Sequence, residues 1–353
     1  MPRHRKGPPG YRLRAPGRLG GRPEAIPWLG GQGLHRQDVS GNNETLRLGL
    51  IGAGPWGRNY IRTIDGLDGV TLFRLASRNP ESAGFVGPRC EISNDWRALI
   101  KAGDLDGVIV AAPPALHAEM TLAAVDRGLP VLVEKPLTLD IAEAEAVLDR
   151  ARSKGAIVLV DHIHLYSAAW EALKRESRRL GPLHAVSTVA GNWGPFRKDT
   201  PMLWDWGSHD VAMCIDLAGR PPDRSTAHLI ETRKTPEGEG RALALELGFG
   251  DVAARIAVSN MHKDKQRLFA AAFEGGELIY DDTRDGDGKL RLKTTPDDPG
   301  GTFKLGPGLP LERVVLAFAA AIALGLPNMD DVELGLDVVR MLARLEETLI
   351  PSE

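Results

Sequence analysis

The sequence predicts an α/β protein in two parts: a doubly wound parallel sheet of the Rossmann type, then an α+β region with a largely antiparallel, open sheet. Three observations support this fold class. The 353 residues are enough for two domains. Apolar runs alternate with helical patterns over residues 46–164, as in repeated βαβ units. Over residues 165–353, strand-like runs instead follow one another, with Gly and Asp turns between them.

The composition is typical of a globular protein, with 42% hydrophobic and 26% charged residues. A formal net charge of -3 gives no global electrostatic argument for binding nucleic acid or an anionic membrane. The two cysteines, Cys90 and Cys214, are too few for a secreted disulfide scaffold or a cysteine-based zinc site. Because no apolar run reaches the roughly 18 residues that span a bilayer, we expect a cytoplasmic protein.

Residues 1–45 differ from the rest of the chain. They are rich in Gly, Pro and Arg, as in the GPPG run at residues 7–10, and have neither helical nor strand periodicity. Such a segment buries too little apolar surface to offset the entropy of ordering it, so we expect a disordered extension without a part in the chemistry. It lacks the apolar stretch of a secretory signal. An organellar transit peptide and an extension upstream of the true start both remain open.

The strands of the first part are predicted from unbroken apolar runs, which are typical of parallel strands covered on both faces. These runs are Leu46–Ile51, Val70–Ala76, Gly107–Ala112, Pro130–Glu134 and Ile157–Val160. Helical patterns lie between them at Asp95–Ala102, His117–Arg127 and Ile141–Lys154. Strand–helix repeats of this kind join parallel strands by right-handed crossovers, and we assign residues 46–164 to a nucleotide-binding domain.

The second part begins with a helix at Ala168–Leu180, a strand near Leu183–Val189 and a helix at His209–Leu217. Further strand-like runs follow at Ala227–Glu231, Ala242–Phe249, Val252–Val258, Gln266–Phe273 and Glu277–Tyr280. Two amphipathic helices, Leu311–Ala323 and Val332–Thr348, end the chain. We assign residues 165–353 to a domain for substrate binding and oligomerisation.

A glycine motif follows the first predicted strand at once and opens a helix. Gly52 permits a tight turn, Gly54 lets the backbone approach a pyrophosphate, and Gly57 lets the helix pack against the strand. The amides and dipole of the helix N-terminus then face the anion. We therefore expect the motif residues Gly52, Gly54, Pro55, Trp56 and Gly57 to bind a dinucleotide, with an ordinary glycine turn as the alternative.

The residues after the second strand, Ser77 and Arg78, bear on the choice of cofactor. A site selective for NAD has an Asp or Glu ~20 residues past the glycines, which binds the ribose 2′-hydroxyl. Here the carboxylate is absent, and Arg78 can pair with a 2′-phosphate. The sequence thus favours NADP, while NAD or dual use stays open if Ser77 and Arg78 form only a solvated turn.

The segment Glu134-Lys135-Pro136 ends a predicted core strand. Ligands of open α/β sheets bind at the carboxyl ends of strands, so a charged pair there is well placed for chemistry. A surface ion pair is the common alternative. Together with the glycine motif and the segment Ala112–His117, these residues resemble the Gfo/Idh/MocA family of oxidoreductases over roughly residues 46–350.

The resemblance implies that Lys135 is catalytic and lies beside the nicotinamide, with Glu134 also at the cofactor. An ammonium there can polarise a carbonyl or stabilise the alkoxide that forms as an alcohol loses hydride. In such proteins the segment containing Ala112, Pro113 and His117 passes the nicotinamide half of the cofactor. His117 is then a cofactor contact and not a catalyst, and otherwise only a residue at a helix start.

Asp205 and His209 are spaced i and i+4, so on a helix both side chains can point into one pocket. The pair is similar to the DxxxH element of the same family, where the His serves as acid–base. An imidazole with a pKa near 6.5 can take a proton from a hydroxyl and return it. Asp205 would bind and orient substrate hydroxyls. A helix-capping Asp with a packed His is the alternative.

His162 and His164 raise the question of a metal site. Alternate residues of a strand share a face, so the two imidazoles could bind a metal together. Nothing else completes a ligand set by spacing, and we expect no metal. The family resemblance places this segment at the domain junction, where His162 would contact the substrate, although relatives often carry an Asn-Arg-type sequence there.

A loop early in the second part carries three of the seven tryptophans, Trp193, Trp204 and Trp206, together with Arg197 and Lys198. Aromatic faces beside cations suit a sugar ring that bears a phosphate or a carboxylate. We therefore expect Trp193, Arg197 and Trp204 to contact the substrate. A packed loop with exposed charges is an equally open alternative.

We expect an NAD(P)-dependent enzyme that transfers a hydride between a nicotinamide cofactor and the secondary alcohol or ketone of a sugar, polyol or nucleotide-linked sugar. Two other classes stay open: a nucleotide-sensing regulator or scaffold of the same fold, and a redox-neutral glycosidase that uses NAD internally. Such regulators tend to lose the lysine and the histidine, which are present here as Lys135 and His209. The resemblance also implies a homodimer or homotetramer that acts on a small molecule, with neither nucleic acid nor membrane as partner.

Overall fold

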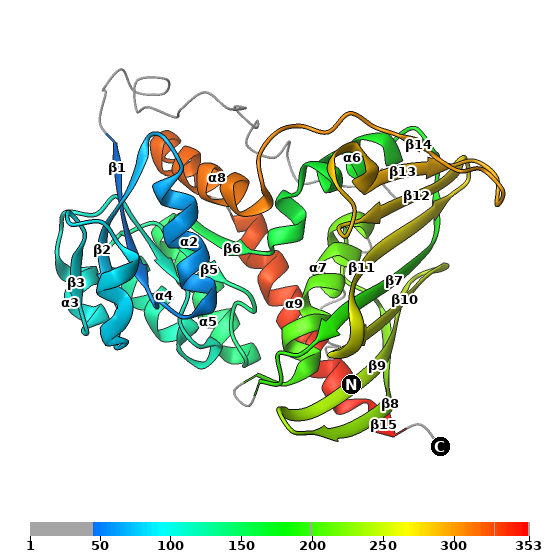
Figure 1. Ribbon diagram of the computed structural model, residues 1–353, viewed down its shortest axis with the longest axis horizontal. Helices are drawn as coiled ribbons and strands as arrows, with labels where there is room; N and C mark the ends of the chain where they lie inside the picture. The colour runs from blue at the N-terminus through cyan, green and yellow to red at the C-terminus, as the bar shows by residue number, and fades with distance from the viewer. Residues whose placement is uncertain (1–44, 198–199, 328, 352–353) are drawn as a thin grey trace, which may run out of the picture.

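The computed structural model describes residues 45–197, 200–327 and 329–351. The predicted extension at residues 1–45 lies outside them, except for its last residue. Figure 1 shows two sheets side by side, with helix α9 (Met329–Glu347) running between them. The described residues contain no helix that is long and apolar enough to cross a membrane.

Six parallel strands form the first sheet, in the order β3-β2-β1-β4-β5-β6. Their bounds are β1 (Leu46–Ile51), β2 (Val70–Ala76), β3 (Glu91–Ser93), β4 (Gly107–Val110), β5 (Val131–Glu134) and β6 (Val158–Asp161). This is the strand order of a Rossmann sheet. Strands β2 and β3 are added on one side of β1, and β4, β5 and β6 are added on its other side. Every residue of β4, β5 and β6 is buried, which is why these strands are apolar runs in the sequence. The predicted doubly wound parallel sheet is confirmed.

The connecting helices of the first sheet are α2 (Pro55–Asp65), α3 (Trp96–Lys101), α4 (His117–Asp126) and α5 (Ile141–Lys154). Aspartate side chains cap the N-termini of α3 and α5. At the start of α5, the Asp140 side chain accepts from the backbone N–H of Glu143, and Gly155 ends the helix with a φ of 56°. Strand β3 was not predicted, because its three mostly exposed residues contain no apolar run.

Nine strands form the second sheet, in the order β14-β13-β12-β11-β7-β10-β9-β8-β15. Their bounds are β7 (Leu183–Trp193), β8 (Arg224–Thr235), β9 (Gly238–Phe249), β10 (Val252–Ser259), β11 (Met261–Phe273), β12 (Gly276–Asp281), β13 (Leu290–Lys293), β14 (Gly301–Thr302) and β15 (Leu349–Pro351). The pairs β7–β10 and β8–β15 are parallel, and the others are antiparallel. The prediction of a largely antiparallel sheet is confirmed, and its two parallel pairs join strands that are distant in the chain.

The helices α6 (Ala168–Ser177) and α7 (Ser208–Ala218) pack on the second sheet. Of the last two helices, one packs on the first sheet and the other lies between the two sheets. Helix α8 (Pro310–Leu324) shares a buried apolar cluster with β1 and α2 of the first sheet. A Cβ atom at Gly107 would lie 2.9 Å from the Phe318 ring, so glycine at the start of β4 lets α8 approach closely. Helix α9 contacts both α5 and α7. The boundary at residue 164 stays a prediction, because α8 follows it in the chain but packs on the first sheet.

Candidate active site

A cavity of about 1280 Å³ extends from the carboxyl ends of the first sheet's strands to residues of the second sheet. Binding sites of open α/β sheets lie at this edge, where the strand order reverses. The predicted site residues in its wall are Gly52, Gly54, Pro55, Trp56, Ser77, Arg78, Ala112, Pro113, His117, Glu134, Lys135, Arg197, Asp205 and His209. One cavity therefore holds both the predicted cofactor residues and the predicted catalytic residues.

The glycine motif forms one end of this cavity. Gly52 has a φ of +101°, which glycine adopts most readily, and a Cβ at Gly57 would lie 2.1 Å from the Gly52 carbonyl oxygen. Gly57 therefore lets α2 pack against the turn, and it does not line the cavity. Gly54 lines the cavity, and a Cβ there would meet nothing within 4 Å. The backbone at Gly54 thus stands open to a ligand at the N-terminus of an eleven-residue helix.

Ser77 and Arg78 follow β2 at the same end of the cavity. The Ser77 hydroxyl oxygen accepts from the backbone N–H of Asn79 (3.2 Å) and from the hydroxyl of Ser82 (2.7 Å), which holds the turn. The Arg78 side chain is exposed and forms no ion pair with another described residue. Its guanidinium is available to a ligand.

His117 connects the loops that follow β4 and β5. It is the first residue of α4 and is buried, with Nδ1 2.8 Å from the Pro136 carbonyl oxygen and Nε2 2.9 Å from the Ala112 carbonyl oxygen. Burial lowers the pKa of His117, although these two carbonyl contacts oppose the shift. The ring fixes the spacing of two strand ends on the cavity wall.

Lys135 reaches from the end of β5 to the opposite wall. Its Nζ donates to Asp205 Oδ1 at 3.0 Å and to the Asp205 carbonyl oxygen at 2.7 Å. The second carboxylate oxygen of Asp205 lies 3.2 Å from Nε of Arg197. Asp205 therefore positions the ammonium group, and one carboxylate is shared by two cations.

A buried carboxyl pair lies beneath Lys135. Glu134 and Asp161 are register partners on neighbouring strands, and Tyr60 donates its hydroxyl to Asp161. Burial raises the pKa of Asp161 to about 6 and raises the pKa of Glu134 well above its ordinary value, with the negative charge of Asp161 adding to the shift in Glu134. The pair is therefore poised to retain a proton near neutral pH, which limits the negative charge beneath Lys135.

His209 lines the same cavity and belongs to the second part of the chain. Asp205 lies in a π-helical turn, Leu203–Gly207, that leads into α7, so the two predicted partners follow wider helical geometry than the expected α-helix. The His209 Nδ1 atom is buried and has no hydrogen-bond partner among the described residues. Burial lowers the pKa of His209 well below 6.5, and the positive charge of Lys135 adds to the shift. A neutral imidazole is thus poised to accept a proton.

Three residues predicted to contact substrate do not line the cavity. Trp204 is buried and donates its indole N–H to Glu346, while Trp193 is exposed and packs edge-on against Phe196. His162 is buried just behind the wall. Lys198 lies outside the described residues.

The expected strand face shared by His162 and His164 does not form. Strand β6 ends at Asp161, and a 3-10 turn over Ile163–Tyr166 follows, so only His164 reaches the cavity. Its ring packs edge-on against His209, with the ring centres 5.0 Å apart. In the described part of the chain, no group of three or more His, Cys, Asp or Glu side chains is placed to hold a metal ion.

Sequence reasoning missed the contribution of the second sheet to the cavity. Arg267 and Lys265 on β11 and Asp282 after β12 line it, and Arg267 forms a buried ion pair with Asp210 at 2.9 Å. The available signal was the alternation of Lys263, Lys265 and Arg267 along one strand, which places cations on one face.

Comparison with known proteins relates this fold and cavity to an oxidoreductase family. Residues 46–162 match the family model GFO_IDH_MocA, an oxidoreductase family with an NAD-binding Rossmann fold. A crystal structure from Magnetospirillum magnetotacticum MS-1, named as a candidate oxidoreductase, is 46% identical, with a TM-score of 0.79 and coverage of 85% of this chain and 99% of that chain.

Two curated relatives are inositol dehydrogenases by name. Inositol 2-dehydrogenase 2 from Saccharopolyspora erythraea is 31% identical over 56% of this chain and 59% of its own length. The scyllo-inositol 2-dehydrogenase (NADP(+)) of Bacillus subtilis is 25% identical over 55% of this chain and 57% of its own length. The chain thus spans less than two thirds of either relative. With its Rossmann sheet, its glycine motif and a structural match over 85% of its length, the chain belongs to the Gfo/Idh/MocA family of oxidoreductases.

Proposed function

We propose that this protein is an NAD(P)-dependent dehydrogenase that acts on a secondary alcohol, or on the corresponding ketone, of a polyol or sugar. One observation carries the proposal. Lys135 from the first sheet and Asp205 from the π-turn are in contact within the cavity that the glycine motif lines. His209 lines the same cavity, and its buried Nδ1 has no hydrogen-bond partner among the described residues. An ammonium, a proton acceptor and a dinucleotide cradle are the parts that reversible alcohol oxidation requires.

The residues present fit a nicotinamide dinucleotide. The open backbone at Gly54 and the amides of the α2 N-terminus suit the pyrophosphate, and the first turn of α2 contains no acidic side chain that would repel it. The exposed Arg78 suits a 2′-phosphate, and Ser77 stands directly after β2, where an NAD-selective site has a carboxylate for the 2′-hydroxyl. We therefore propose NADP as the preferred cofactor, in keeping with the B. subtilis relative that is named for NADP(+).

The bound cofactor would supply the hydride acceptor, and the side chains of this chain would manage the proton and the charge. In the oxidation direction, neutral His209 accepts the proton of the substrate hydroxyl. The Lys135 ammonium stabilises the negative charge that develops on that oxygen. Asp205 keeps the ammonium oriented, since it contacts Nζ through both its carboxylate and its carbonyl oxygen. Lys135 thus acts from the end of β5, whereas Asp205 and His209 belong to the π-turn and to the helix that follows it.

The names of the relatives support a polyol or sugar as the substrate class. Self-association as a homodimer or homotetramer is a proposal that rests on the family resemblance. A cytoplasmic location is a proposal that rests on the sequence composition.

A turnover screen tests the proposed function. The purified protein is incubated with NADP or NAD and a panel of inositols, sugars, sugar acids and nucleotide sugars, and formation of the reduced cofactor is followed by absorbance. We expect at least one member of the panel to yield reduced cofactor, with a Lys135→Met variant as the inactive control. Cofactor binding without turnover of any member would contradict the proposal and indicate a nucleotide-binding regulator. Substrate loss without net reduced cofactor would indicate a redox-neutral glycosidase.

A further inference from the structure

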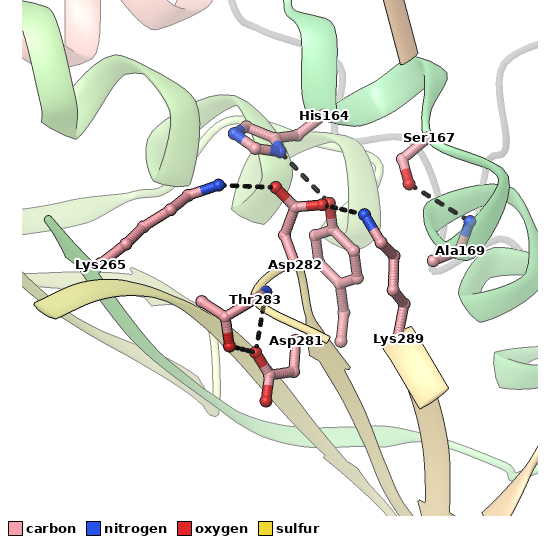
Figure 2. A network of polar contacts seen from close by, with 9 residues as sticks. His164, Ser167, Ala169, Lys265, Asp281, Asp282, Thr283 and Lys289 are labelled. Carbon is pink, nitrogen blue, oxygen red and sulfur yellow. Dashed lines mark hydrogen bonds and ion pairs between the residues drawn. The ribbon is translucent and has the colours of Figure 1, made fainter. Parts of the chain in front are cut away.

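The second-sheet wall of the cavity carries more positive than negative side chains. Figure 2 shows Asp282 between Lys265 and Lys289, with Oδ2 3.4 Å from the first ammonium and Oδ1 2.7 Å from the second. One carboxylate is thus shared by two lysines, as the Asp205 carboxylate is shared by Lys135 and Arg197. Among the described residues, each of these clusters carries one positive charge in excess.

Arg267 adds a buried guanidinium to the same wall. Its side chain is 4% exposed, and its ion pair with Asp210 uses Nη1. Its guanidinium carbon lies 5.8 Å from the centre of the Trp206 ring, which also lines the cavity. The Trp206 indole N–H is buried and has no acceptor among the described residues. A buried donor of this kind costs free energy until an acceptor reaches it.

These cations also act on the histidines of the cavity. The pKa of His164 lies well below 6.5, chiefly because of burial, with further lowering by the charges of Arg267 and Lys265. In Figure 2 the His164 ring stands beside the Lys265–Asp282–Lys289 cluster, and its Nδ1 lies 3.3 Å from the Tyr280 hydroxyl. The wall is therefore electropositive at the end of the cavity opposite the glycine motif.

We propose that this wall, formed by Lys265, Arg267 and the Trp206 indole, binds an anionic group of the substrate, a carboxylate or a phosphate ester. This inference rests on the proposed function, since it names the class of polyol or sugar that the enzyme takes. An oxyanion satisfies the excess positive charge and the indole N–H together, and it can accept further hydrogen bonds from the Arg267 guanidinium. A neutral polyol leaves the charge uncompensated. The substrate is accordingly a sugar acid or a sugar phosphate.

Anion binding can be measured without turnover. The protein is saturated with NADP, which occupies the cradle at the glycine motif, and is titrated in a calorimeter with malonate, with inorganic phosphate and with uncharged myo-inositol. Malonate represents a carboxylate source and phosphate a phosphate-ester source. We expect one of the two anions to bind more tightly than myo-inositol and to lose affinity as salt is added.

Two variants that each remove one lysine charge locate the site. Lys265→Gln should weaken binding of that anion about fivefold to tenfold, whereas Lys263→Gln, on the same strand but outside the cavity wall, should not. Both lysines are exposed, so both variants should fold. Failure of both anions to bind, or equal affinity of the bound anion for the two variants, would overturn the inference.

The two proposals fail differently. If no polyol or sugar yields reduced cofactor while Lys265→Gln, and not Lys263→Gln, weakens anion binding, the dehydrogenase function fails and the anion site stands. If neutral polyols are oxidised and neither anion binds, the dehydrogenase function stands and the anion site fails.

Discussion

The glycine motif permits a test that separates cofactor binding from folding, through Gly54→Ala. Gly54 has φ and ψ angles of -66° and -174°, which alanine adopts without strain, and its Cβ would meet nothing within 4 Å. The substitution removes glycine, which is favourable at a helix N-cap, but it also reduces the entropy of the unfolded chain. The free energy of unfolding should therefore change by less than about 1 kcal/mol.

Cofactor affinity should respond much more strongly. If a pyrophosphate approaches the backbone at Gly54, an added methyl group displaces it and weakens charge-assisted hydrogen bonds of ~1.5–3 kcal/mol each, so the dissociation constant should rise at least about tenfold. Calorimetric titration with NADP and NAD measures this, beside thermal unfolding of the same samples. Gly84→Ala, where a Cβ also meets nothing within 4 Å, is the matched control outside the cavity.

Gly57→Ala, unlike Gly54→Ala, should change the stability of the fold. Its Cβ would lie 2.1 Å from the Gly52 carbonyl oxygen, so the variant should lose stability. A Gly54→Ala protein that binds both cofactors with the affinity of the original chain would refute the assignment of the cradle.

Three further predictions concern charge. Arg78→Ala should weaken NADP binding at least about tenfold and leave NAD binding unchanged, because only NADP carries the 2′-phosphate; equal losses for both cofactors in titrations would contradict this. In the pH profile of kcat/KM for alcohol oxidation, the midpoint of the acid limb should lie below the ordinary histidine pKa. The reason is that burial lowers the pKa of His209 and that its neutral form is the base. A midpoint above the ordinary histidine pKa would remove His209 from this role. Asp161→Asn should stabilise the fold above pH ~6 by up to about 3 kcal/mol, with the gain fading towards pH ~4. The raised pKa of Asp161, about 6, means that its favourable contribution is present when it is protonated and is lost as the pH rises through that value. Unfolding curves at both ends of this range check the sign.

The first sheet could be predicted closely from the sequence because its strands are buried on both faces. The runs Leu46–Ile51 and Val70–Ala76 were placed with the bounds that the structure has, and so was the helix at Ile141–Lys154. Short edge strands such as β3 and β14 could not be predicted, since exposed residues carry no periodic signal. The return of α8 to the first sheet also has no local signal, because it depends on packing between distant segments.

The candidate site was predictable where its residues belong to motifs. Lys135 and Asp205 were each expected at the active site, and the structure brings these two residues, 70 positions apart, into contact. Side-chain directions could not be predicted where the backbone departs from a regular period. Asp205 lies in a π-turn and not in an α-helix, and β6 ends before His162. Arg267 and Lys265 were missed because no motif marks them, and only the pairing of β11 in the second sheet brings them to the cavity.

The most direct test of the dehydrogenase assignment is the turnover of a His209→Ala variant with the substrate that the screen identifies. Positioned acid–base catalysis contributes ~10²–10⁴ in rate, so kcat for cofactor reduction should fall within that range while the dissociation constant for NADP stays unchanged. His184→Ala, at an exposed position on β7 outside the cavity, should leave both values unaltered. Turnover of His209→Ala equal to that of the original chain would contradict the assignment of this cavity's chemistry.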